Sequence, residues 1–198
     1  MNASDIIDNC LRAIGESNTS SPSEMSRVQC LAHINQAYQN IIGPKLKIYK
    51  NATPTVTVGV FPVPSDFLEI VSVWDGTLDD GVELEEIYDL ADKAKDDAEC
   101  TQYFVADEET IWIYGQTPTT TVTIYYFAQP AALTDSLSSY PTKLNKKFHQ
   151  NAFTTYIKMI ISKERNESDY FTLQAEWLDI LDEIGDLKSS CFQQKIWW

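Results

Sequence analysis

Apolar positions repeat at helical spacing at both ends of this chain. The first repeat, between residues 6 and 14, predicts a helix with Ser4 as its N-cap. A second helix is predicted to begin at the capping box Ser21-Pro22-Ser23-Glu24 and to end at Gly43-Pro44. Two longer helices, each with an apolar stripe, are predicted at about residues 142–163 and 168–188.

Between the helical segments, the pattern changes to the alternation that is typical of strands. Residues 67–74 form a longer apolar run, which predicts a strand buried on both faces. The other strands are predicted at residues 55–58, 102–106, 110–114 and 121–127. The whole pattern predicts an α+β fold in which a four-helix body, residues 1–46 and 135–188, carries an inserted antiparallel β subdomain at residues 47–134.

The C-terminal residues 189–198 show no helical period and end in Lys195-Ile196-Trp197-Trp198. Tryptophan side chains are costly to leave in water, and tryptophan is the residue most enriched at binding hot spots. We therefore expect residues 189–198 to form an extended arm that docks on a partner through Lys195, Ile196, Trp197 and Trp198. The alternative is that the arm folds back onto its own helices.

Charge is distributed unevenly along the chain. The 198 residues carry a net charge of −14, and the window from Asp75 to Glu109 holds 14 of the 29 acidic residues against two lysines. Such a surface repels phosphate backbones, which disfavours specific nucleic-acid binding but allows a wall past which DNA slides. The simpler interpretation is a solvated acidic face. No apolar run is long enough to span a bilayer and no secretory signal is evident, so we expect no membrane contact and assembly in a cytoplasm.

Side chains suited to catalysis are sparse. His33 and His149 lie within predicted helices without a nucleophile pattern beside them, and no glycine-rich phosphate loop or zinc spacing is found. The four cysteines are scattered, and Cys10 and Cys30 fall on apolar helix faces, where reduced thiols act as small core residues. We expect no enzymatic activity, no cofactor and no metal site.

One acidic stretch imitates a calcium-binding loop. Asp75, Asp79 and Glu86 fall at the first, fifth and twelfth positions of such a loop, but Asp80 stands where the sharp turn requires glycine. A solvated turn is the favoured interpretation.

Aromatic residues in the β region could instead form a platform for sugars, although packing of a sheet produces the same alternation. These residues are Tyr103, Phe104, Trp112, Tyr114, Tyr125 and Tyr126.

The order of these patterns is similar to a known family. The β region opens with Pro64-Ser65-Asp66-Phe67-Leu68-Glu69-Ile70, and Tyr103-Phe104-Val105 forms a hairpin with Ile111-Trp112-Ile113. Val122-Thr123-Ile124-Tyr125-Tyr126 and Pro130-Ala131-Ala132-Leu133-Thr134 follow before the last two helices. This order, over roughly residues 21–188, resembles the head-to-tail adaptor (connector) proteins of tailed bacteriophages, the kind called tail tubular protein A in short-tailed phages.

The resemblance implies a structural virion protein without a catalytic role. It implies a homo-oligomeric ring of twelve subunits at the head–tail interface, between the portal protein and a tail or nozzle protein. DNA would pass through the lumen without sequence-specific binding, and the arm at residues 189–198 would reach the portal. Two alternatives stay open: another tail-neck component, such as a stopper or terminator, and a glycan-binding module that uses the aromatic residues of the β subdomain.

Overall fold

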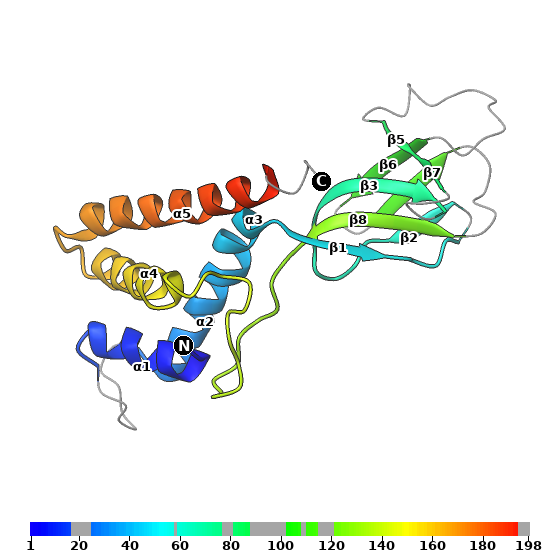
Figure 1. Ribbon diagram of the computed structural model, residues 1–198. Helices are drawn as coiled ribbons and strands as arrows, with labels where there is room; N and C mark the ends of the chain where they lie inside the picture. The colour runs from blue at the N-terminus through cyan, green and yellow to red at the C-terminus, as the bar shows by residue number, and fades with distance from the viewer. Residues whose placement is uncertain are drawn as a thin grey trace. The chain divides into compact units, whose positions relative to one another are not determined.

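The computed structural model describes residues 1–16, 25–57, 59–76, 81–87, 102–107, 110–114 and 121–193, with the backbone alone at 107, 114 and 188–193. The chain divides into a helical unit, Met1–Ile48 with Gln129–Trp198, and a β unit, Tyr49–Ala128. Helices lie at both ends of the chain, with two small sheets between them in sequence (Figure 1), so the predicted α+β fold is confirmed.

The chain begins with helix α1, Ala3–Ala13. Its N-cap is Asn2 rather than the predicted Ser4, because the Asn2 side chain accepts a hydrogen bond from the Asp5 backbone N–H at 2.8 Å. Helix α2, Arg27–Asn35, begins with a capping box between Ser26 and Gln29. The capping box predicted at residues 21–24 lies outside the described residues.

The helical segment that begins with α2 is predicted to end at Gly43-Pro44, but it runs past these residues. It continues from α2 through the π-helix η1, Gln36–Ile42, into the short helix α3, Gly43–Leu46. Pro44 lies in the first turn of α3, directly after the π-helical stretch, and the first turn of a helix is where proline is most common. The path ends instead at Lys47, which adopts the left-handed conformation with φ 43°.

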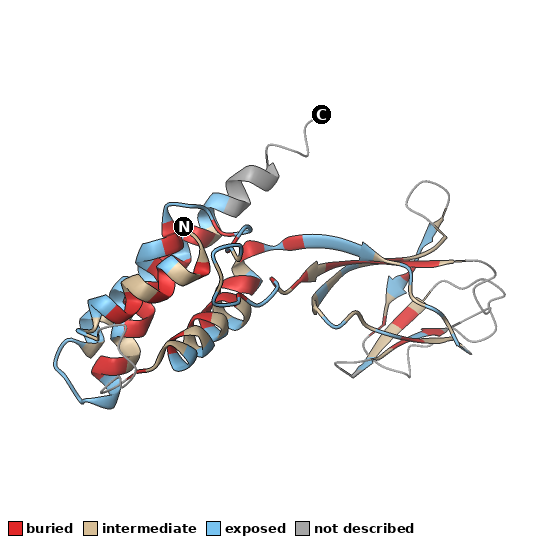
Figure 2. Cartoon of the chain, turned by 90° about the horizontal axis from the view of Figure 1, so that it is seen from below, coloured by how far each residue is buried: buried red, intermediate tan, exposed pale blue. Residues whose placement is uncertain are grey.

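Helix α4, Phe148–Glu164, lies between α1 and α5 (Figure 1) and forms the core of the helical unit. It begins later than predicted, because residues 142–147 form turns. Much of α4 is buried (Figure 2), since other helices pack on more than one of its sides. Its buried apolar residues are Phe148, Ala152, Phe153, Tyr156, Ile157 and Ile161.

Helix α5, Tyr170–Gln193, runs past residue 188. The helical backbone therefore includes residues 189–193, which the sequence pattern assigned to an extended arm. No glycine or proline follows Gly185 to stop the helix.

The β unit contains two four-stranded sheets. The first sheet has the order β1 (Ile48–Ala52), β8 (Val122–Ala128), β3 (Phe67–Asp75), β4 (Val82–Glu83). The second has the order β2 (Val60–Pro62), β7 (Thr110–Tyr114), β6 (Gln102–Asp107), β5 (Glu85–Glu86). The insertion is predicted to be antiparallel, but it also contains one parallel pair, β5 with β6.

Strand β8, not β3, is the buried strand of the first sheet. β8 pairs with β1 on one side and with β3 on the other, and nearly all of its residues are buried. Along β3 only Val73 is buried, and Val71 is exposed. The strand predicted at 55–58 does not form over 55–57, where Thr57 bridges to Val60 around Gly59. The fully buried Phe61 and Ile111 of one sheet and Val73 and Ile124 of the other are consistent with two sheets packed face to face.

A connecting segment, residues 129–147, ties the N-terminal helices to α4. The Asn35 side chain donates a hydrogen bond to the Leu133 carbonyl at 2.9 Å and accepts one from the Leu133 N–H at 2.7 Å. Gln39 donates to the Pro130 carbonyl at 3.1 Å. Gly43 lies so near Pro130 that a Cβ atom at Gly43 would be 2.8 Å from the Pro130 Cδ.

We predict that Gly43→Ala destabilises the helical unit by about 1–3 kcal/mol, because the added methyl group forces Pro130 or η1 to move. Gly185→Ala is the matched control, since its Cβ would meet only the Lys45 Cδ at 3.8 Å and alanine favours a helix interior. Urea unfolding followed by circular dichroism measures both. Equal stability of the two variants would contradict this close contact.

Candidate functional site

The predicted docking residues Lys195, Ile196, Trp197 and Trp198 lie outside the described residues. The described backbone ends at Gln193, the last residue of α5. Their role in docking stays a prediction.

Most of the acidic window also lies outside the described residues, including Asp79 and Asp80 of the calcium-like stretch. Within the described part, Glu83 lies in β4, and Glu85 and Glu86 form β5. The described residues contain no group of three or more histidine, cysteine or acidic side chains able to hold a metal ion.

The aromatic residues of the β unit serve mainly as core. Tyr103, Tyr125 and Tyr126 are buried, whereas Trp112 is 42 % exposed and lies directly opposite Phe104 on the neighbouring strand. The side chain of Tyr114 lies outside the described residues. A sugar platform needs several accessible rings on one face, and three of the proposed rings are buried.

The histidines do not form a catalytic arrangement with the described residues. The His149 ring is buried, its Nε2 lies 3.0 Å from the Leu144 carbonyl, and its Nδ1 has no hydrogen-bond partner among the described groups. His33 lies on α2, half-buried. Cys10 and Cys30 are free and buried, as expected for structural thiols. A hydrogen bond with Cys10, together with burial, raises the pKa of the Cys30 thiol, and a neutral thiol is a poor nucleophile.

A polar cluster surrounds Arg27, and no pattern in the sequence predicts it. The Arg27 guanidinium donates two hydrogen bonds to Asp135, at 2.9 and 2.8 Å, and others to Asp8 and Ser4. These bonds join α1, α2 and the connecting segment. The hydrogen bond from Arg27 holds the pKa of the Asp135 carboxyl below its usual value. Residues 8, 27 and 135 are too far apart in sequence for any local pattern to pair them.

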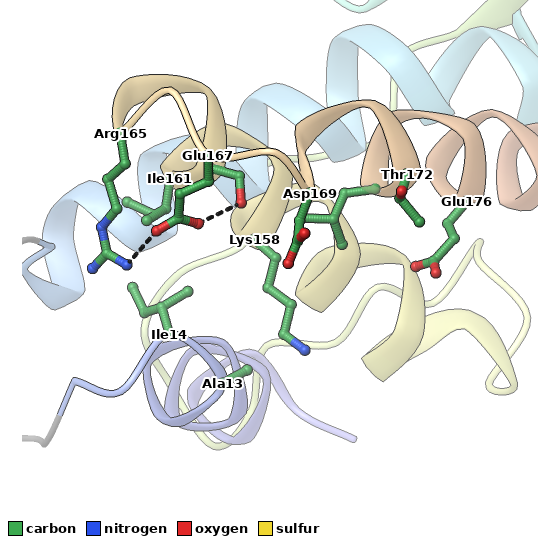
Figure 3. A pocket seen from close by; sticks show the side chains of 11 residues that line it. Ala13, Ile14, Lys158, Ile161, Arg165, Glu167, Asp169, Thr172 and Glu176 are labelled. Atoms are coloured by element: carbon green, nitrogen blue, oxygen red, sulfur yellow. Dashed lines mark hydrogen bonds and ion pairs between the residues drawn. The ribbon is translucent and has the colours of Figure 1, made fainter.

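A hollow of about 540 Å³ lies where the end of α1 meets the end of α4 and the start of α5 (Figure 3). Glu167 accepts hydrogen bonds from Ser162 at 2.9 Å and from Arg165 at 3.2 Å, and both lower the pKa of its carboxyl. Lys158 extends into the hollow, while Asp169 and Glu176 line its other side (Figure 3). Charges of both signs line this open hollow. The Ser162 hydroxyl is bonded to Glu167, but a carboxylate whose pKa is lowered is a weak base, and no histidine is among the described residues that line the hollow.

Two sets of exposed apolar residues belong to different elements of the helical unit. The first, the α5 stripe, consists of Phe171, Ala175 and Leu178, which share one exposed face of α5 at helical spacing. The second set, named the α2 patch, consists of the exposed Val28 of α2 and the exposed Leu137 and Tyr140 of the connecting segment. Arg27 of α2 holds this segment at Asp135, and the Ser139 carbonyl accepts a hydrogen bond from the Ala3 N–H of α1 at 2.7 Å.

Exposed apolar residues on a folded helical unit are a feature of proteins that bind other proteins. Comparison with known families agrees with this class. The family described as SU10 adaptor protein matches residues 1–188. The chain belongs to the SU10 adaptor protein family, a family of phage adaptor proteins with a structural role.

No curated protein matches the chain significantly. Among the described residues, none of the helices has the length and apolar character needed to cross a membrane.

We predict that Asp135→Asn lowers the free energy of unfolding at neutral pH by about 1 kcal/mol, because both partners are about a third exposed and solvent screens the ion pair. The pKa of Asp135 is lowered in the folded state, so its contribution is present at neutral pH and is lost as the pH falls through that value. The difference between wild type and variant should therefore shrink in acid. Urea unfolding at neutral and acidic pH measures it.

The control for this prediction is Asp179→Asn, which removes an exposed carboxylate from α5. A penalty for Asp135→Asn that persists unchanged in acid would show that the ion pair is not its cause.

Proposed function

We propose that this phage adaptor protein is a head-to-tail adaptor, which forms a homo-oligomeric ring between the portal protein and a tail or nozzle protein. The family match over residues 1–188 supports this proposal most strongly. The ring is expected to contain twelve subunits, as the resemblance to connector proteins of the tail tubular protein A type implies.

The two exposed apolar surfaces give the ring a physical basis. A contact between different surfaces of identical subunits is heterologous, and such contacts generate a closed ring when the rotation between subunits permits it. The α5 stripe and the α2 patch belong to different elements of one helical unit, so the stripe of one copy could pack on the patch of the next. Helix–helix contacts of this kind would form the body of the ring.

The arm is proposed to extend from the end of α5 to the portal. Since α5 continues to Gln193, the proposed arm begins at residue 194, and residues 194–198 include Trp197 and Trp198. Tryptophan gives a large contact area with few rotatable bonds, so two of them make an effective anchor for a short segment.

The acidic window would let DNA pass without adhesion. Its 14 acidic residues against two lysines repel phosphate groups, and this repulsion is strongest within about 10 Å at moderate salt. A lumen with this charge would guide DNA without sequence-specific binding. A stopper or terminator of the tail neck is the alternative within the same structural class.

We predict that Leu178→Glu prevents ring formation while the subunit stays folded, because a carboxylate would be buried in an apolar contact. Asn151→Glu is the matched control, since it adds the same charge to an exposed position of α4, outside the α5 stripe. Light scattering and negative-stain microscopy report the rings, and circular dichroism reports the fold. Rings from both variants would exclude the α5 stripe as the contact.

We predict that removal of residues 194–198 leaves the helical content and the ring intact but abolishes co-sedimentation with isolated portal complexes. The reason is that the deletion begins after the last described helical residue and removes the proposed anchor. A matched chain that keeps its length but carries Ile196→Ser, Trp197→Ser and Trp198→Ser separates the effect of the side chains from that of length. If either chain still binds the portal as the wild type does, the arm is not the anchor.

A further inference from the structure

Two cysteines meet in the core of the helical unit. Cys10 lies on α1 and Cys30 on α2, and both are free thiols with 0 % exposure. The two thiols are hydrogen-bonded to each other, so their sulfur atoms are in contact although they belong to different helices. Cys10 also lies against α4, since its Sγ is 3.9 Å from the Thr154 hydroxyl.

The bonds of Arg27 hold the two helices together at the same place. Arg27 precedes Cys30 by three residues, so both lie on one face of α2. The Arg27 guanidinium donates hydrogen bonds to Asp8 and Ser4 of α1. One face of α2 therefore contacts α1 at Arg27 and again at Cys30, and this double contact keeps the two sulfur atoms together in the folded subunit.

We propose that Cys10 and Cys30 are a reversible disulfide site, which links α1 to α2 when the protein meets a low-molecular-weight disulfide such as oxidised glutathione. The inference does not depend on the proposed ring, because both cysteines belong to one subunit. A disulfide bond is about 2.0 Å long, so the two side chains must rotate and approach from their hydrogen-bonded positions.

The reaction is a thiol–disulfide exchange in two steps. One cysteine loses its proton to solvent, and its thiolate attacks a sulfur atom of glutathione disulfide, whose S–S bond breaks and releases one glutathione. The other cysteine, deprotonated in turn, attacks the protein-bound sulfur atom of this mixed disulfide and releases the second glutathione. The two cysteines lose two electrons and two protons in total, and the glutathione disulfide is reduced to two thiols.

Burial controls when this reaction takes place. Neither thiol is accessible to a glutathione molecule in the folded subunit. The hydrogen bond with Cys10 and burial also raise the pKa of Cys30 and keep its thiol neutral. The first step therefore waits for a local opening of the contact between α1 and α2. The bonds from Arg27 to α1 oppose this opening and so limit how often the site is reached.

A disulfide site of this kind fits a structural protein of a phage. Cytosolic thiols are held reduced, whereas disulfides persist outside the cell. A phage particle is assembled in the first environment and released into the second, so the two cysteines would be thiols during assembly and a disulfide afterwards. The bond would close a loop of about 20 residues in the unfolded chain, which stabilises the folded subunit.

The experiment treats the full-length protein, shown to be folded by circular dichroism, with glutathione disulfide. Iodoacetamide stops the reaction, and mass spectrometry identifies the linked peptides. We expect a Cys10–Cys30 disulfide rather than a lasting glutathione adduct, because the second thiol is in contact with the first. The midpoint of urea unfolding should rise by about 1 M on oxidation, and dithiothreitol should reverse the rise.

Three results would overturn the proposal. They are glutathione adducts on Cys10 or Cys30 without the link, no reaction at either thiol, and a link that leaves the urea midpoint unchanged. Cys30→Ala is the control for the other cysteines, since it keeps a small apolar side chain at the buried position. Oxidation should leave its midpoint unchanged, and a rise equal to that of the wild type would also overturn the proposal.

A second pair of variants tests the control by local opening. Asp8→Asn weakens the bond from Arg27 and should accelerate formation of the link about two- to fivefold, the range expected for loss of a partly exposed ion pair. Asp179→Asn is the matched control, because it removes an exposed carboxylate from α5 rather than from the contact between α1 and α2. Equal rates in the two variants would overturn the proposal that opening of this contact limits the reaction.

Discussion

The helical unit depends on one constraint, the close passage of the connecting segment across the N-terminal helices. Asn35 satisfies both the N–H and the carbonyl group of Leu133, and Gly43 leaves room for Pro130. Buried backbone groups without partners are costly, so these side-chain bonds allow an irregular segment to lie against helices. The bond network of Arg27 holds Asp135 further along the same segment. Helices separated by the whole β unit in sequence thereby share a single core.

The sequence predicts those helices and strands whose position depends on local periodicity. Helical spacing of apolar residues places α1, α4 and α5, and alternation reveals the hairpin of β6 and β7, because each pattern reflects one buried face. Helix ends are less predictable. Pro44 continues a helical path because it falls at the start of a new helix after a π-helical stretch, and α5 continues beyond Lys188 because no residue stops it.

Long-range packing and the candidate site are harder to predict. The burial of β8 rather than β3 follows from the strand order, which no single strand encodes. The Arg27 bonds combine residues from α1, α2 and the connecting segment, which are distant in sequence, so local patterns do not reveal them. Trp197 and Trp198 differ from these long-range features, because two adjacent tryptophans predict a binding role from the sequence alone.

A ring-forming adaptor requires that identical helical units meet through two different surfaces and that the assembly binds a portal. Single-particle electron microscopy of the full-length protein mixed with isolated portal complexes tests this claim most directly. The account predicts an annular assembly seated on the portal, with the α5 stripe of each copy against the α2 patch of the next. Monomeric chains beside bare portals, or a ring whose subunits meet through other surfaces, would contradict it.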